Sequence, residues 1–133
     1  MYMKEKQTSV FSSQTVTDAS IRQIAAICPK LQKLCISKCA ELSDLSLMTL
    51  SQNNLLLNTL EASGCRNFTD IGFQALGKNC KYLERMDLKE CNQITDLTLA
   101  QLVTGCPSLE KLNRLPNTGH RLRQKILVQG LYC

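Results

Sequence analysis

The residue types best able to do chemistry in this chain are its eight cysteines and its single histidine, His120. Cysteines that bind zinc or act as nucleophiles need partners placed close beside them. The closest pairs, Cys35 with Cys39 and Cys28 with Cys35, do not form the paired C-x-x-C of a zinc site. His120 lies in a stretch without acidic residues, and no Ser/His/acid set or glycine-rich phosphate loop is visible. We therefore predict a protein that is not an enzyme and uses no metal or cofactor.

The spacing of the cysteines indicates a structural role instead. Cys39, Cys65 and Cys91 follow one another at 26-residue steps, and Cys80 and Cys106 are separated by the same step. A free cysteine packs well as a small buried hydrophobe, provided that a reducing compartment keeps the thiol free. The N-terminal stretch has no secretory apolar region, and no apolar run is long enough for a membrane span. We expect buried thiols and a location in the cytoplasm or the nucleus.

Other residue types repeat at the same 26-residue step, and together they outline one unit. One column consists of aspartates, each preceded by Thr or Ser: Asp18, Asp44, Asp70 and Asp96. Another column consists of leucines: Leu31, Leu57, Leu83 and Leu109. In the third unit the pattern L-x-x-L-x-L-x-x-C over 83–91 predicts a strand, and a turn follows it. Thr95 then suits a helix N-cap and Asp96 the first turn, because both favour the helix N-terminus.

A strand–helix unit of this length cannot bury its apolar side chains alone, so neighbouring units must stack. The sequence therefore predicts an α/β fold, a leucine-rich-repeat solenoid of about four 26-residue repeats. Parallel strands would form the concave face and helices the convex face. Because aromatic residues are scarce and Trp is absent, we expect an aliphatic core.

The repeat pattern divides the chain into three segments. Residues 14–113 hold the repeats, and residues 1–13 form an N-terminal arm or a degenerate strand near Thr8–Ser12. Residues 114–133 are off-register and carry four of the basic residues and no acid, so most of the net charge of +5 belongs to them. Two interpretations of this tail stay open. It forms a C-terminal cap, or it is a variant tail.

Strand positions between the leucine columns point to solvent and stack into three columns of mixed charge. Solenoids bind partners on such extended surfaces, and mixed charge suits a protein or peptide better than a polyanion. The alternative is that these are merely soluble surface residues, and Cys35 in particular is either an exposed thiol of the site or a surface cysteine without a role. The predicted partner-binding residues are Lys33, Thr59, Arg85 and Lys111, then Cys35, Glu61 and Asp87 (with Asn113 in the same column), then Ser37, Ser63 and Lys89.

The stretch from Cys80 to Leu112, CKYLERMDLKECNQITDLTLAQLVTGCPSLEKL, resembles the cysteine-containing repeats of animal F-box/LRR-repeat proteins. The resemblance extends over about Thr17 to Leu112 and is specific for the class of repeat. In that family an F-box docks on Skp1 within a cullin-based (SCF) ubiquitin ligase, and the repeats hold the protein substrate. The resemblance implies a substrate-recognition module in ubiquitin-dependent protein degradation.

The chain departs from the family pattern, because residues 1–13 are too few to hold an F-box. Skp1 and a cullin would then need a docking surface outside the visible repeats. A free-standing repeat adaptor, or a competitor that does not assemble a ligase, is the first alternative. The second is a binder of anionic surfaces that acts through the tail residues Arg114, Arg121, Arg123 and Lys125. Four charges make a weak case, so we expect neither nucleic acid nor membrane as the partner.

Overall fold

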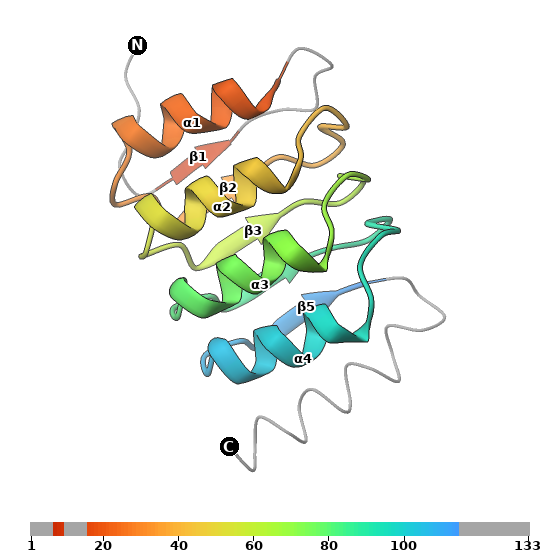
Figure 1. The fold of residues 1–133 in the computed structure, drawn as a ribbon. Helices are drawn as coiled ribbons and strands as arrows, with labels where there is room; N and C mark the ends of the chain where they lie inside the picture. The colour runs from red at the N-terminus through yellow and green to blue at the C-terminus, as the bar shows by residue number, and fades with distance from the viewer. Residues whose placement is uncertain (1–6, 10–15, 115–133) are drawn as a thin grey trace.

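A computed structural model gives the structure of the chain and describes residues 7–9 and 16–114. In these ranges strands and helices alternate from one end to the other (Figure 1). The elements are β1 (Gln7–Ser9), α1 (Asp18–Ile27), β2 (Lys33–Cys35), α2 (Asp44–Asn53), β3 (Thr59–Glu61), α3 (Asp70–Asn79), β4 (Arg85–Asp87), α4 (Asp96–Gly105) and β5 (Lys111–Asn113).

The strands form one parallel sheet in the order of the sequence, β1-β2-β3-β4-β5. Each pair is in register at the 26-residue step, so that Leu34 faces Leu60 and Leu60 faces Met86. The four helices lie side by side on one side of the sheet (Figure 1). The predicted α/β fold with parallel strands is confirmed. Within the described ranges, no helix is long and apolar enough to cross a membrane.

The strands are shorter than the sequence pattern predicts. The pattern covers residues 83–91, whereas β4 spans only Arg85–Asp87. Shortly after β2, β3 and β4 the chain turns through a left-handed residue, at Lys38 (φ 65°), Gly64 (φ 80°) and Glu90 (φ 61°) respectively. These three positions share the 26-residue step, so the turn is part of the repeat and ends the extended backbone early.

The core lies between the sheet and the helices and is built from the predicted apolar columns. Leu31, Leu57 and Leu83 of the first leucine column are fully buried, and so is Leu60 of the next. The expectation of an aliphatic core holds for most of it but fails in one place. Phe68 and Phe73 are both buried and pack edge to face, with ring centroids 5.8 Å apart.

The helices begin where the sequence predicts, because a hydroxyl side chain caps three of them. Ser43, Thr69 and Thr95 each accept a hydrogen bond from the backbone N–H two residues on, at 3.2–3.3 Å. This satisfies one of the donors that a helix N-terminus leaves free. The prediction of Thr95 as an N-cap is confirmed.

The aspartates of the repeat join neighbouring units. Asp18 accepts hydrogen bonds from the backbone N–H of Ser43 (2.9 Å), from its hydroxyl (2.7 Å) and from the hydroxyl of Ser46 (2.6 Å). Asp70 accepts the equivalent bonds from Thr95 and from the hydroxyl of Thr98. One cap hydroxyl thus stabilises its own helix and also donates to the carboxylate of the preceding unit. We call this series of bonds the aspartate ladder, with Asp18, Asp44 and Asp70 as its acceptors.

At Asp96 the aspartate ladder ends differently. The residue that would donate to it, 25 positions further on, is Arg121, which lies outside the described residues. The side chain of Asp96 is 76% exposed and forms an ion pair with Nη1 of Arg114 at 3.5 Å. Arg114 also donates from Nη2 to the carbonyl of Ile94 at 2.9 Å. The first residue of the predicted off-register tail therefore folds back onto the last repeat unit.

Burial and hydrogen bonding act in opposite directions on the pKa of two of the ladder aspartates, Asp18 and Asp70. Burial raises the pKa of Asp18 and Asp70, but the side-chain and backbone hydrogen bonds that they accept together lower it more, so the net pKa is lowered. A carboxyl whose folded pKa lies below its unfolded value binds fewer protons when folded. Its stabilisation is therefore present above the unfolded pKa and is lost as the pH falls through the folded one.

Asp70→Asn should lower the free energy of unfolding at neutral pH by about 1–2 kcal/mol, because two units lose charge-assisted hydrogen bonds at a partly exposed site. The variant should also lose part of the decline in stability that the parent chain has below about pH 4. Urea unfolding followed by circular dichroism from neutral to acid pH measures both effects. Asp87→Asn is the control, since Asp87 accepts a hydrogen bond from Lys89 in its own unit. Equal losses for both variants would contradict a role of the ladder between units.

Candidate protein-binding surface

The side of the sheet that faces away from the helices carries all ten residues predicted to bind a partner. We call this side the strand face. Five of the ten side chains are exposed and five are partly buried. The exposed ones are Lys33, Glu61, Arg85, Lys89 and Lys111, and the partly buried ones are Cys35, Ser37, Thr59, Ser63 and Asp87.

The strand pattern determines which side chains reach this face. In β4, Met86 is buried under the helices while Arg85 and Asp87 on either side of it point away from the core. The same alternation in β2 and β3 leaves Lys33 and Glu61 exposed. Because the strands are in register, equivalent side chains of successive units lie next to one another and form continuous columns.

A hollow of about 340 Å³ lies at the centre of the strand face. Leu60 and Met86 also line this hollow, and since their side chains are buried on the helix side of the sheet, they contribute backbone to its floor. Polar and charged side chains of β2 to β5 line the rest, namely Lys33, Thr59, Glu61, Arg85, Asp87, Lys111 and Asn113. The structure thus brings six of the ten predicted residues together around one hollow. Cys35, Ser37, Ser63 and Lys89 lie outside it.

Like charges stand opposite one another on adjacent strands of this face. Arg85 pairs in register with Lys111, and Glu61 pairs in register with Asp87. Neighbouring strands are about 4.8 Å apart, so each pair costs up to about 1 kcal/mol in water and more where solvent is displaced. In the described part of the chain the ion pair between Arg114 and Asp96 is the only one. Among the residues that the structure describes, no opposite charge therefore lies within ion-pair distance of these four groups.

Sequence reasoning missed a second group of residues beside this face. Leu56 and Tyr82 are exposed, and they line a hollow of about 260 Å³ together with Gln32, Asn58, Glu84 and Ser108. A signal was present in the sequence, because Leu56 and Tyr82 are one repeat apart and Lys30 and Ser108 occupy the same column. The polar residues Lys30 and Ser108 identify this column as exposed, so the large apolar residues Leu56 and Tyr82 depart from the pattern expected of a solvent-exposed position.

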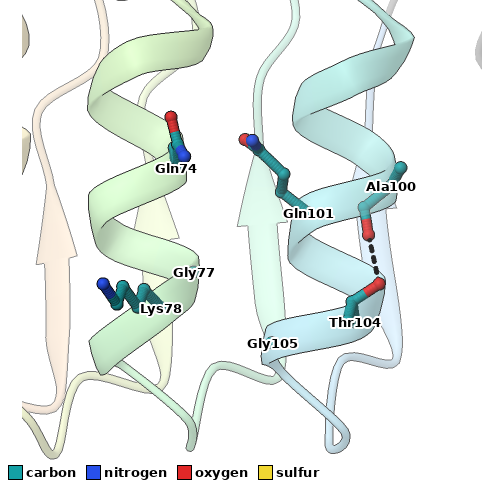
Figure 2. A pocket seen from close by; sticks show the side chains of 7 residues that line it. All are labelled: Gln74, Gly77, Lys78, Ala100, Gln101, Thr104 and Gly105. Carbon is teal, nitrogen blue, oxygen red and sulfur yellow. Dashed lines mark hydrogen bonds between the residues drawn. The ribbon is translucent and has the colours of Figure 1, made fainter.

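A third hollow, of about 540 Å³, lies on the helix side between α3 and α4 (Figure 2). Gln74 and Lys78 reach it from α3, and Gln101 and Thr104 reach it from α4. Thr104 donates a hydrogen bond to the carbonyl of Ala100. The side-chain oxygen of Gln101 is buried and has no hydrogen-bond partner in the described part of the chain.

Two glycines explain the shape of this third hollow. A Cβ atom on Gly105 would lie 2.0 Å from the carbonyl oxygen of Gly77, so the two helix backbones approach more closely than any side chain would allow. The missing side chains leave the space above the contact open. Gly105 is not among the residues predicted from the sequence to bind a partner, and we attribute the hollow to helix packing.

The cysteines lie mainly in the core and bond across units. Cys65 and Cys91 donate their S–H groups to the carbonyls of Ile36 (3.0 Å) and Ala62 (3.2 Å), each 29 residues earlier. Burial raises the pKa of Cys65 to about 12 and that of Cys91 to about 11. Burial likewise raises the pKa of Cys80 to about 12 and that of Cys106 to about 11. Such thiols stay protonated at neutral pH and are poor nucleophiles.

Several predictions concern residues whose surroundings the structure leaves open. His120, Cys133 and residues 115–133 of the basic tail lie outside the described residues, so both interpretations of the tail stay predictions. The segment boundaries also stay predictions, although β1 supplies a strand within the predicted arm at Gln7–Ser9. No group of three or more potential metal ligands occurs in the ranges that the structure describes.

No family model matches the chain, and no curated protein matches it. Solved structures do match. The chain is similar to part of the crystal structure of the Rad7 and Elc1 complex in yeast, with a TM-score of 0.70 and 22% identity. This match covers 78% of the chain but only 26% of its counterpart, so the chain spans about a quarter of that protein's length.

Two further structures have the same arrangement. The C-terminal domain of tropomodulin from Caenorhabditis elegans matches 96% of the chain and 84% of the domain, with a TM-score of 0.67 and 14% identity. The Chaetomium Mex67:Mtr2 subunits match 87% of this chain and 85% of theirs, with a TM-score of 0.58 and 14% identity. At such low identities these likenesses show a shared fold and nothing about a shared activity.

Cys35 should be the one cysteine among residues 16–114 that reacts with iodoacetamide in the folded protein, because it is partly exposed while the others are buried. The measurement is intact-mass spectrometry at about pH 8, near the ordinary pKa of a thiol, in a Cys133→Ser background. Full labelling in urea is the positive control. Labelling of further cysteines at the same rate in the native protein would contradict their place in the core.

Proposed function

We propose that this chain is a leucine-rich-repeat solenoid whose strand face recognises a protein substrate for an SCF-type ubiquitin ligase. Parallel strands lie about 4.8 Å apart whereas packed helices need 8–10 Å, so the strand side is shorter and the stack curves toward it. The strand face is then the concave surface. The chain acts in the cytoplasm or the nucleus by binding alone, and partner enzymes transfer ubiquitin.

The observation that carries the proposal is that two pairs of like charges stand in register on the strand face. Arg85 beside Lys111, and Glu61 beside Asp87, weaken the isolated chain slightly, and none of these four groups forms an ion pair within the described residues. A partner with opposite charges would remove both repulsions at once. The electrostatic repulsion that destabilises the free chain is then replaced by attraction to the partner. Proteins that carry the same charges as the strand face at these positions are repelled.

The two columns also indicate the chemistry of the partner. The basic pair and the acidic pair lie two residues apart along the strands, which is about 7 Å. A polyanion such as nucleic acid would meet the acidic pair and be repelled by it. A folded protein or a peptide that carries acidic and basic side chains side by side complements both columns.

The comparisons support the binding role in a general way. Two of the three similar structures named above are complexes of two proteins, Rad7 with Elc1 and Mex67 with Mtr2. The ligase part of the proposal depends on the resemblance of the repeats to those of F-box proteins, in which such repeats hold the substrate. A free-standing adaptor or competitor uses the same surface and differs only in the absence of ligase subunits.

The combined variant Arg85→Glu, Asp87→Lys and Lys89→Glu should abolish binding of the proteins that the parent chain captures from eukaryotic cells. The three side chains lie together on and after β4, and reversal turns attraction into repulsion. Affinity purification with quantitative mass spectrometry measures the loss, and circular dichroism checks that the stack is folded.

The matched control is Arg22→Glu, Glu41→Lys and Lys78→Glu, which makes the same change in net charge at exposed positions away from the strand face. It should retain every partner. If the control loses the partners while the strand-face variant keeps them, the binding surface lies elsewhere, and the hollow beside Lys78 becomes the candidate.

The ligase role makes a separate prediction for the same purification. Skp1 and a cullin should accompany the parent chain and remain with the strand-face variant, because they would dock outside the repeats. Partners that depend on the strand face but come without Skp1 and cullin would reject the ligase role and favour the adaptor. This outcome would leave the binding surface itself supported.

A further inference from the structure

Leu56 and Tyr82 lie exposed beside the strand face, and neither packs into the core. Their exposed fractions are 41% and 60%. They occupy equivalent positions in successive units, in the turns that precede β3 and β4. Both line the hollow of about 260 Å³, so they are the apolar walls of a concave site rather than isolated surface residues.

The rest of this hollow is polar and defines what can enter. Gln32, Asn58, Glu84 and Ser108 complete its lining. The exposed carboxylate of Glu84 repels an acidic side chain at this position. A large apolar side chain fits instead, because it gains contact with Leu56 and Tyr82 and leaves the polar rim in water. Tyrosine is also among the residues that most often contribute strongly to protein interfaces.

The residues of this hollow lie close along the chain to the charged columns of the strand face. Tyr82 precedes Arg85 by three residues, and Leu56 precedes Thr59 by three. Three residues span at most about 10 Å even in extended backbone. A partner segment whose acidic side chain meets Arg85 and Lys111 is therefore within reach of Leu56 and Tyr82 with its neighbouring residues.

We propose that Leu56 and Tyr82 form an apolar anchor site for the protein segment that binds the strand face. The segment presents a large apolar side chain to this site and an acidic side chain, within about 10 Å of it, to Arg85 and Lys111. This inference rests on the proposed function and specifies its partner. The basic pair selects the acidic group, and the anchor site selects the residue beside it.

The test is selection of a displayed library of random peptides of about 12 residues, long enough to span both sites, on the full chain. Peptides selected by the parent chain should be enriched in Phe, Tyr, Trp, Leu or Met placed within about three residues of Asp or Glu. The variant Leu56→Ser with Tyr82→Ser should lose the apolar enrichment and keep the acidic one. For the best parent peptide its Kd should rise about tenfold or more, the effect of losing an interface hot spot.

The matched control is Leu45→Ser with Ile71→Ser, a pair that is one repeat apart and similarly exposed, at 57% and 66%, but belongs to the helices. It should select the same peptides as the parent. The variant Arg85→Glu with Lys111→Glu should lose the acidic enrichment.

The outcomes separate the two proposals. If the acidic enrichment depends on Arg85 and Lys111 while the apolar enrichment survives loss of Leu56 and Tyr82, the anchor site is rejected and the strand face stands. If the parent enriches no peptide that depends on Arg85 and Lys111, both proposals are rejected.

Discussion

Hydrogen bonds between successive units are the interaction on which the rest of the structure depends. Asp18, Asp44 and Asp70 each reach the N-cap residue 25 positions later, and that residue caps its own helix with the same hydroxyl. One short side chain thus sets where a helix starts and how it lies against its predecessor. No unit has this arrangement by itself, because the acceptor and the donor belong to different repeats. A repeat stack is consequently stabilised by its interfaces, and loss of one interface affects both neighbours.

The second set of bonds between units explains why cysteine suits the core. Cys80 and Cys106 lie at helix C-caps and place their S–H groups near the carbonyls of Asn54 (3.6 Å) and Cys80 (3.3 Å), 26 residues earlier. Asn54 holds the same position one unit before and donates to the carbonyl of Cys28 at 2.6 Å. The amide donates a stronger bond, but its oxygen is buried without a hydrogen-bond partner in the described chain. A thiol gives a weak donor and leaves no second polar atom to satisfy.

The features of the fold and of the candidate site that could be predicted from the sequence are those that recur with the 26-residue period. The α/β fold, the parallel strands and the cap at Thr95 were predictable, since each is a local pattern seen several times at one step. The bonds of Asp70 to Thr95 and Thr98 were not, because a first-turn aspartate also has a sufficient local explanation in the helix dipole. Likewise, the close approach of Gly105 to Gly77 depends on how two helices pack against each other, and the residue spacing within one repeat does not reveal this packing. The ten residues of the strand face could be named, but the hollow and the group around Tyr82 required coordinates.

The separation of core and surface along each strand is what lets this face carry unfavourable charges. Met86 and Leu60 are held under the helices, so the side chains beside them contribute little to stability and can repel one another at small cost. The repulsion is not spread evenly over the sheet. Within the basic column Thr59 separates Lys33 from Arg85, and the in-register like-charge pairs lie only across β3 to β5. The two turns that expose Leu56 and Tyr82 lead into β3 and β4 of this same group. Like charges in register and apolar surface without cover therefore coincide on neighbouring strands and the turns that lead into them, and one bound protein segment would relieve both.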